Sequence, residues 1–256
     1  INGEAANDVS GISISLSSDG SRLAIGGYLN DGVNGSDSGH VRIYQYNNNS
    51  WSQLGADIDG EAAGDQSGYS VSLSSDGSRV AIGAIRNDGT SGDANDNRGH
   101  VRIYDYTPSG TSSWTQVGGD IDGEAAADTS GWKVSLSPDG SRVAIGAPSN
   151  DANGSSSGHV RIYDFNGSAW AQVGADIDGE AAGDQSGRSI SLSSDGLRMA
   201  IGAPFNDGNG SDSGHVRVHG LGGYKYLWDV DGGSTPSSGT YYVTVAGTQT
   251  TGNAYV

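Results

Sequence analysis

Apolar and polar residues alternate along short stretches of this chain, and the same alternation returns four times. In the second copy, residues 69–74 and 79–83 alternate with a period of two. This period is typical of β-strands that bury one face. The Asp76-Gly77 pair between the two stretches is a strong hairpin signal. The pattern therefore predicts two antiparallel strands joined by a tight turn.

Two further strands are predicted in the second copy. Residues 100–106 and 114–118 form the third and fourth segments, and Ala94 is the one apolar residue in the loop 87–99. Helical periodicity is absent throughout. Four antiparallel strands in about 60 residues are typical of a propeller blade. A β-helix would use shorter coils, and a sandwich would not repeat its sequence.

The repeats begin at Ile1, Ile58, Ile121 and Ile177, so they lie 57, 63 and 56 residues apart. We expect an all-β fold, a β-propeller built from four visible four-stranded repeats of about 57–63 residues. Their boundaries are 1–57, 58–120, 121–176 and 177–219. No signal peptide is visible and Ile1 is not a start methionine, so we expect a mature form or a piece of a longer protein.

The predicted core lies between blades. Valine, isoleucine and leucine are expected on one face of each sheet, while serine, alanine and glycine on the other face let the next sheet approach. The predicted inter-blade core of the second copy consists of Val71, Leu73, Val80, Ile82, Val101 and Ile103.

Charge and composition argue against several classes of partner and exclude some kinds of site. The chain has 30 acidic against 13 basic residues and a net charge of −17, which argues against nucleic acid and anionic membranes as partners. No apolar run approaches the roughly 20 residues of a membrane span, so membrane insertion is not expected. Cysteine is absent, which excludes disulfides and thiolate metal sites. Eight arginines recur at two fixed repeat positions, and we expect structural roles for them.

At residues 68–106 the chain resembles the FG-GAP repeat of integrin α-type β-propellers. The Gly146-Ala147-Pro148 and Gly202-Ala203-Pro204 segments match the family motif. The initial phenylalanine of the motif is replaced by serine, as in Ser67-Gly68, and the calcium loop is shortened to residues 75–78. The family's calcium site is therefore not carried over. Residues 137–145 also resemble the hairpin of TolB-like propellers, which again concerns the fold.

The sequence of the tail, residues 220–256, differs from that of the four repeats. Residues 238–247 alternate and predict a strand. The segment resembles the beginning of an immunoglobulin-like repeat of bacterial surface proteins. Alternatively, the tail supplies the missing fourth strand of the last blade.

Loops between the second and third strands collect aspartate and asparagine. Hard oxygen ligands of this kind suit Ca²⁺, the one cofactor that the sequence suggests. The alternative is that they form Asx-turns in solvated loops. The candidate calcium ligands are Asp31, Asn34, Asp37, Asp88, Asp93, Asp96, Asp151, Asp207 and Asp212.

The connectors between repeats form a second acidic group. In a propeller they emerge on the same side as the loops, so we expect an acidic loop face that serves as the binding face. Capping turns and pairing with the recurrent arginines are the structural alternative. The residues concerned are Asp59, Glu61, Asp65, Asp122, Glu124, Asp128, Asp178, Glu180 and Asp184.

Other recurrent residues favour structural roles. His40, His100, His159 and His215 begin the third strand of each copy, and hydrogen bonding is their expected role. Trp51, Trp114 and Trp170 are expected to fill the rim, with carbohydrate stacking as the alternative. No catalytic constellation is evident, so an enzyme is not expected.

These observations predict a non-catalytic extracellular or cell-surface module that mediates binding or adhesion. The acidic loop face would contact a protein, a glycan or copies of the chain itself. The alternative is a structural subunit of an extracellular filament, sheath or viral particle. A carbohydrate-active enzyme is a third hypothesis.

Overall fold

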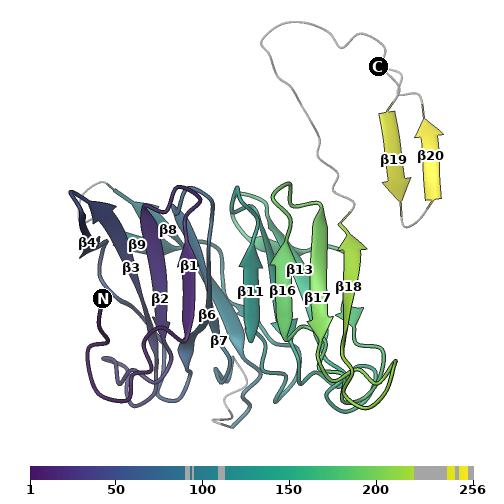
Figure 1. Cartoon of the computed structure of the whole chain (residues 1–256), viewed down its shortest axis with the longest axis horizontal. Helices are drawn as coiled ribbons and strands as arrows, with labels where there is room; N and C mark the ends of the chain where they lie inside the picture. Colours follow the sequence, from purple (N-terminus) through teal and green to yellow (C-terminus); the bar gives the residue numbers. More distant parts are fainter. Residues whose placement is uncertain (90–92, 94, 109–112, 222–240, 246–247, 253–256) are drawn as a thin grey trace, which may run out of the picture.

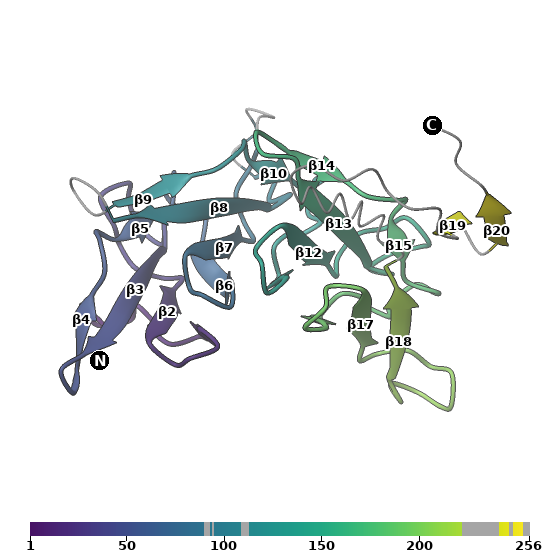
Figure 2. The ribbon, with the colours of Figure 1, turned by 90° about the horizontal axis from the view of Figure 1, so that it is seen from above.

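The computed structural model describes residues 1–89, 93, 95–108, 113–221, 241–245 and 248–252. These residues form strands and connecting turns without any helix. Four antiparallel sheets stand side by side (Figure 1). Seen from above, they follow one another along an open arc (Figure 2). The predicted all-β, propeller-type architecture of four repeats is confirmed. The described residues contain no helix that is long and apolar enough to cross a membrane.

Each sheet corresponds to one repeat and is called a blade. Blade 1 contains β1 (Ser13–Leu16), β2 (Arg22–Gly27), β3 (His40–Asn47), β4 (Ser50–Gln53) and β5 (Ile58–Asp59). Blade 2 contains β6 (Ser67–Leu73), β7 (Arg79–Ala84), β8 (His100–Thr107), β9 (Ser113–Gln116) and β10 (Ile121–Asp122). Blade 3 contains β11 (Lys133–Leu136), β12 (Arg142–Ala147), β13 (His159–Phe165), β14 (Trp170–Gln172) and β15 (Ile177–Asp178). Blade 4 contains β16 (Ser189–Leu192), β17 (Arg198–Ala203) and β18 (His215–Gly220).

The outer edge of each complete blade is divided between two strands. In blade 1, β4 pairs with the second half of β3, and β5 pairs with its beginning at His40 and Val41. The sequence repeat places Ile58 and Asp59 at the start of the second copy, but these residues complete the sheet of the first. The connector that follows β5 then crosses to blade 2. This division places the last residue before β5, Asp57, next to the start of β3.

The Asp-Gly hairpins form as predicted. Gly77 has a φ of 66°, a conformation that glycine adopts without strain. The Oγ of Ser74 donates to Oδ1 of Asp76 at 2.7 Å and accepts the amide of Arg79 at 3.0 Å. The amide of Ser75 in turn donates to the carbonyl of Pro138 in the next blade at 2.8 Å. Each hairpin thus closes its own turn and joins the neighbouring blade.

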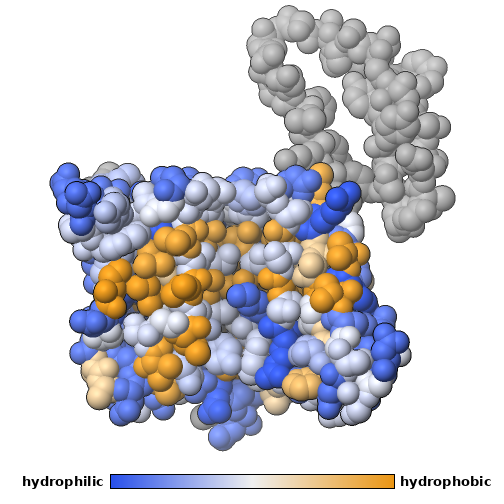
Figure 3. All heavy atoms as spheres, viewed as in Figure 1, coloured by the Kyte–Doolittle hydropathy of each residue, from blue (hydrophilic) through white to orange (hydrophobic). Residues whose placement is uncertain are grey.

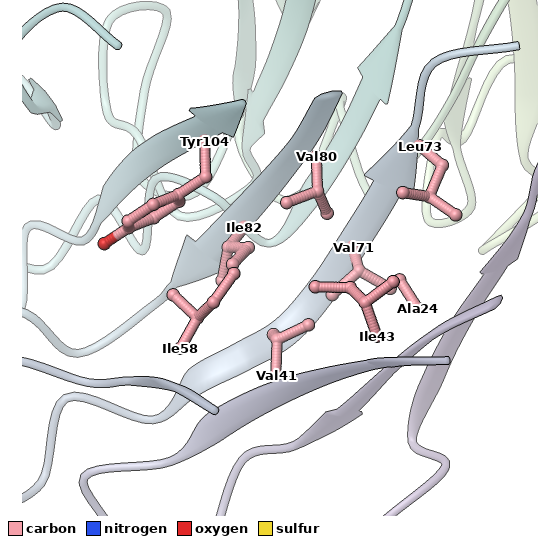
Figure 4. Close-up of a cluster of buried hydrophobic side chains, with 9 residues drawn as sticks. All are labelled: Ala24, Val41, Ile43, Ile58, Val71, Leu73, Val80, Ile82 and Tyr104. Atoms are coloured by element: carbon pink, nitrogen blue, oxygen red, sulfur yellow. The ribbon is translucent and has the colours of Figure 1, made fainter. Parts of the chain in front are cut away.

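The core lies between blades, as predicted. Figure 4 shows apolar side chains of blades 1 and 2 pointing toward one another. The buried cluster between these blades consists of Ala24, Val41, Ile43, Ile58, Val71, Leu73, Val80, Ile82 and Tyr104. An equivalent cluster between blades 2 and 3 contains Val101 and Ile103.

The prediction that large apolar side chains share one face of each sheet was wrong. Val80 is paired with Tyr104 toward blade 1, whereas Ala81 is paired with Ile103 toward blade 3. Both faces of an inner blade are buried, so both need apolar side chains. The third strand supplies them on the face where the second strand presents alanine and glycine.

At one position of the repeat, a glycine sets the distance between neighbouring blades. A Cβ on Gly83 would lie 2.1 Å from the carbonyl oxygen of Gly131 in blade 3. A Cβ on Gly26 would likewise collide with the carbonyl oxygen of Gly68 in blade 2, and one on Gly146 with that of Gly187 in blade 4. The hydroxyl of Ser70 donates to that same carbonyl of Gly131 at 2.7 Å. The small residues therefore allow backbone and hydroxyl contacts between neighbouring sheets.

In the tail, β19 (Tyr241–Val245) pairs with β20 (Thr248–Gly252). β19 lies within the stretch whose alternation predicted a strand. Residues 222–240, which precede it, lie outside the described part of the chain. The two interpretations of the tail therefore stay predictions.

Candidate functional site

The loops between second and third strands and the connectors between blades share one side of the array. The side-chain amide of Asn34 donates to the carbonyl of Gly60 at 2.7 Å, and Asn153 does the same to Gly179 at 2.8 Å. The amide of Gly64 donates to the carbonyl of Ser36 at 2.9 Å. The loops and connectors thus hold each other, and together they form the loop face.

Four aspartates of the connectors are buried structural groups. Oδ2 of Asp65 accepts the amide of Ala62 at 2.9 Å and the side-chain amide of Asn87 at 3.0 Å, and Asp65 is 3% exposed. Asp128 and Asp184 accept equivalent bonds from Asn150 and Asn206. These side chains close the connector onto the loop of the same blade, which leaves them little surface for a partner. Asp8 is the equivalent residue of blade 1.

The candidate calcium ligands lie in the loops and close their own turns. Oδ1 of Asp31 accepts the amide of Asp37 at 3.0 Å, and Oδ1 of Asp207 accepts the amide of Asp212 at 2.8 Å. The remaining turns follow the same principle: Asp88 accepts from Asn97, Asp93 from Asn95, Asp151 from Ser156, and Asp96 binds Arg98. The metal-competent groups of the described residues contain none of these side chains. Calcium binding by the loops stays a prediction.

The histidines meet carboxylates from two other segments. Nδ1 of His40 lies 3.7 Å from Oε2 of Glu4 and 3.6 Å from Oδ2 of Asp57. Glu4 comes from the connector before the blade, and Asp57 from the break between β4 and β5. Three such trios, each with its ligand atoms within 4.8 Å of one another, occur in the described residues: Glu4/His40/Asp57, Glu61/His100/Asp120 and Glu124/His159/Asp176.

Each carboxylate of a trio is oriented through its second oxygen. Oδ1 of Asp120 accepts from the side-chain amide of Gln116 at 2.7 Å. Oε1 of Glu61 lies 3.5 Å from Nη1 of Arg102. Nη2 of Arg102 donates to the carbonyl of Asp59 at 2.7 Å, so this arginine also ties the connector to blade 2. Glu61 therefore serves structurally as well, and Asp59, Asp122 and Asp178 contribute their carbonyls in the three copies.

In the second and third trios, burial favours the neutral imidazole. Burial, together with the charge of Arg102, lowers the pKa of His100 to about 4. Burial likewise lowers the pKa of His159 and raises the pKa of Glu61 and of Glu124. At neutral pH the imidazoles of His100 and His159 therefore each have one nitrogen with a free lone pair. The expected hydrogen bonds of His40 and His159 are not formed, since both nitrogens of each ring are buried without a partner.

A row of stacked aromatic and guanidinium groups crosses all four blades. Tyr28 meets Tyr69 edge to face with ring centroids 5.5 Å apart, and Tyr69 lies 4.9 Å from Trp132. The guanidinium of Arg188 lies 5.0 Å above Trp132 and 5.2 Å from Phe205. We call these five residues the aromatic row. They belong to the ends of second strands and the starts of first strands, where the loop face begins, and all five are partly or fully exposed.

The aromatic row was not predicted from the sequence, although one signal marks it. The residue after the Ser-Gly pair at the start of each repeat is Ile12, Tyr69, Trp132 and Arg188 in the four copies. The residues on either side of this position are nearly identical among copies, because the packing of the blades requires them. The position itself holds a different type of side chain in each copy, so blade packing does not fix its identity. Its side chain is therefore available to contact a ligand.

The tryptophans of the fourth strands lie on the opposite, outer edge. Nε1 of Trp114 donates to the carbonyl of Leu54 at 2.8 Å, and Trp170 does the same to Val117 at 2.9 Å. Each therefore joins its blade to the preceding one. This contact agrees with the rim-filling role that the sequence predicted.

The fold is a propeller-type array of four-stranded blades with a structured loop face. Residues 176–218, which include β16, β17 and most of β18, match the family model of the FG-GAP repeat. Blade 4 is therefore similar to the FG-GAP repeat, and the three preceding blades share its sequence pattern and its antiparallel strand order. The resemblance to FG-GAP propellers is thus confirmed. A search among curated proteins gave no match.

Proposed function

We propose that this chain is a non-catalytic binding module that recognises a protein through the aromatic row on its loop face. The observation that carries the proposal is the row itself. Tyr69, Trp132 and Arg188 form one connected surface although they come from three blades. Tyrosine, tryptophan and arginine dominate the binding energy of protein interfaces. Acidic loops beside the row would select a partner with a basic patch.

The proposal places the module outside the cell, since FG-GAP repeats typically occur in extracellular proteins. The absence of catalysis rests on the repetition of the loop face. A repeated surface offers each acidic group several times and gives no unique pair for acid–base chemistry. A glycan is the second ligand class, because aromatic side chains with a few polar groups also line small-molecule sites.

The test uses the whole chain against a panel of purified extracellular proteins and a glycan array. Trp132→Ala and Arg188→Ala should each weaken binding to the recognised protein at least tenfold, the effect of about 1.4 kcal/mol. Trp51→Ala is the matched control, because Trp51 stacks on Tyr46 at the outer edge of blade 1. Binding that all three variants retain would refute the aromatic row as the binding surface. Glycan binding lost in the same two variants would assign the row to sugars.

A second candidate, a subunit of a larger assembly, rests on the two end faces of the array. Ile14 and Leu16 of blade 1 are 66% and 57% exposed, while their equivalents Val71 and Leu73 are 4% and 7% exposed. At the other end, Val216 and Val218 are each 67% exposed. Figure 3 shows these apolar patches over β1 and over β18. Each end therefore presents a surface that is buried wherever another blade follows.

Sedimentation velocity over a wide concentration range tests this second candidate. Head-to-tail association should give larger species, and Val218→Asp should abolish them because it places a charge in the contact. A monomer at every concentration would count against self-assembly.

A further inference from the structure

We propose that each His/Glu/Asp trio binds one divalent transition-metal ion of the Zn²⁺ type, so that blades 1 to 3 carry three equivalent metal sites. The sites lie where the connector of the preceding blade, the start of the third strand and the break before the fifth strand meet. This proposal is independent of the aromatic row.

The first argument is the state of the histidines. His40 and His159 are each 1% exposed, and neither ring nitrogen of either residue has a hydrogen-bond partner. A buried polar group without a partner is strongly unfavourable. The same burial recurs at His100. A metal ion at Nδ1 supplies the missing partner for the side of the ring that faces the carboxylates.

The second argument is distance. Zn²⁺ binds imidazole nitrogen and carboxylate oxygen at about 2.0–2.2 Å, so two ligands of one tetrahedral ion lie about 3.4 Å apart. In blade 1 the two distances from Nδ1 of His40 to the carboxylates are 3.6 and 3.7 Å, and in blade 3 those from His159 are 3.8 and 3.9 Å. These separations are too long for hydrogen bonds. They exceed the ideal ligand spacing by only a few tenths of an ångström.

The third argument is the support of the ligands. Gln53, Gln116 and Gln172 each donate to the second oxygen of the trio aspartate. Arg42, Arg102 and Arg161 each lie beside the second oxygen of the trio glutamate. Outer contacts of this kind orient metal ligands in proteins. The same support recurs in all three blades.

The ligand set selects the type of ion. One imidazole and two carboxylates suit Zn²⁺ and its first-row neighbours, whereas Ca²⁺ takes oxygen ligands only. Glu4 and Asp57 are 44% and 28% exposed at their side chains, so an ion can enter from solvent and keep a water ligand. In blade 4, His215 and Glu180 approach to 3.5 Å, and the equivalent of the trio aspartate falls outside the described residues.

The experiment measures Zn²⁺ bound to the metal-free whole chain by equilibrium dialysis with elemental analysis. At least three ions per chain should bind, one for each trio, with Kd below about 0.1 mM. Asp120→Asn and His100→Gln should each remove one ion. Asp122→Asn, which removes a carboxylate two residues further along, should remove none.

Co²⁺ in place of Zn²⁺ should give visible absorption of a four-coordinate nitrogen and oxygen site, reduced by about a third in Asp120→Asn. Excess Ca²⁺ should leave the bound Zn²⁺ in place. Absence of saturable Zn²⁺ binding would overturn the proposal, as would displacement by Ca²⁺. An unchanged ion count in folded Asp120→Asn would also overturn it, and circular dichroism establishes the folding of that variant.

Discussion

The guanidinium of Arg79 binds the carboxylate of Asp105 through two hydrogen bonds, of 2.5 Å from Nε and 2.7 Å from Nη2. Its third nitrogen donates to the carbonyl of Gly140 in the next blade at 2.9 Å. The same group lies 4.8 Å from the ring centroid of Phe165. One side chain thus connects two strands of its own blade with the hairpin and the outer aromatic pair of the next.

Replacement of this arginine tests its structural role. Arg79→Ala should destabilise the chain by about 1–3 kcal/mol, because it leaves a half-buried carboxylate and a carbonyl without partners. Arg198→Ala is the matched control, since Arg198 is exposed and faces Gly220 across the strand pair. Urea unfolding gives both values. Equal losses in the two variants would contradict the inter-blade role.

A methyl group at the closest contact between blades should be poorly tolerated. Gly83→Ala would place a Cβ 2.1 Å from the carbonyl oxygen of Gly131, which the backbone must move to relieve. We expect a loss of about 1–3 kcal/mol or more. In Gly202→Ala the nearest atom is the rotatable Oγ of Ser189, so its loss should be smaller. The melting temperatures of the two variants measure both losses. A smaller decrease for Gly83→Ala than for Gly202→Ala would contradict the close contact between blades at Gly83.

Identical residues at one repeat position should differ in importance according to their place in the array. Ile190 of blade 4 is 6% exposed between blades, whereas its counterpart Ile14 of blade 1 is 66% exposed. Ile190→Ala should cost about 2–5 kcal/mol. Ile14→Ala should change the free energy of unfolding by no more than about 0.5 kcal/mol. If Ile14→Ala proves as costly, then its face is covered in solution.

The hairpin aspartates should make stability depend on acid pH. Hydrogen bonds from Ser17 and Ser21 lower the pKa of Asp19 to about 2 from its usual 3.8. Because the folded value is the lower one, this carboxylate stabilises the fold above its unfolded pKa, and the effect is lost as pH falls toward 2. Asp19→Ala should therefore lower the melting temperature more at pH 7 than at pH 3. A constant difference would show that charge plays no part.

Calcium remains a separate prediction for the loops. If Asp31, Asp151, Asp207 and their neighbours bind Ca²⁺, then millimolar Ca²⁺ should raise the melting temperature by several degrees through linkage. The increase should exceed that of Mg²⁺ and of NaCl at matched ionic strength. Equal increases would indicate charge screening alone. The loops would then be Asx-turns, as the hydrogen bond from the amide of Asp37 to Asp31 already suggests.

The sequence alone determined the strands, the hairpins and the number of blades. These features depend on neighbouring residues: alternation fixes which side chains share a face, and Ser74, Asp76 and Gly77 close their turn with local bonds. The interior positions Val71 and Ile82 followed from the same alternation. A repeat of this kind also implies stacked units, because one sheet cannot bury its own faces.

The tertiary structure decided which residues of different strands and different blades contact one another. Val101 and Ile103 face the opposite neighbour from Val80 because the register of β7 and β8 assigns them there. The carboxylates of Glu61 and Asp120 reach His100 only after the connector crosses between blades and the outer edge strand breaks. The aromatic row likewise joins residues from four repeats, because packing of blade on blade, rather than local pattern, brings them into contact.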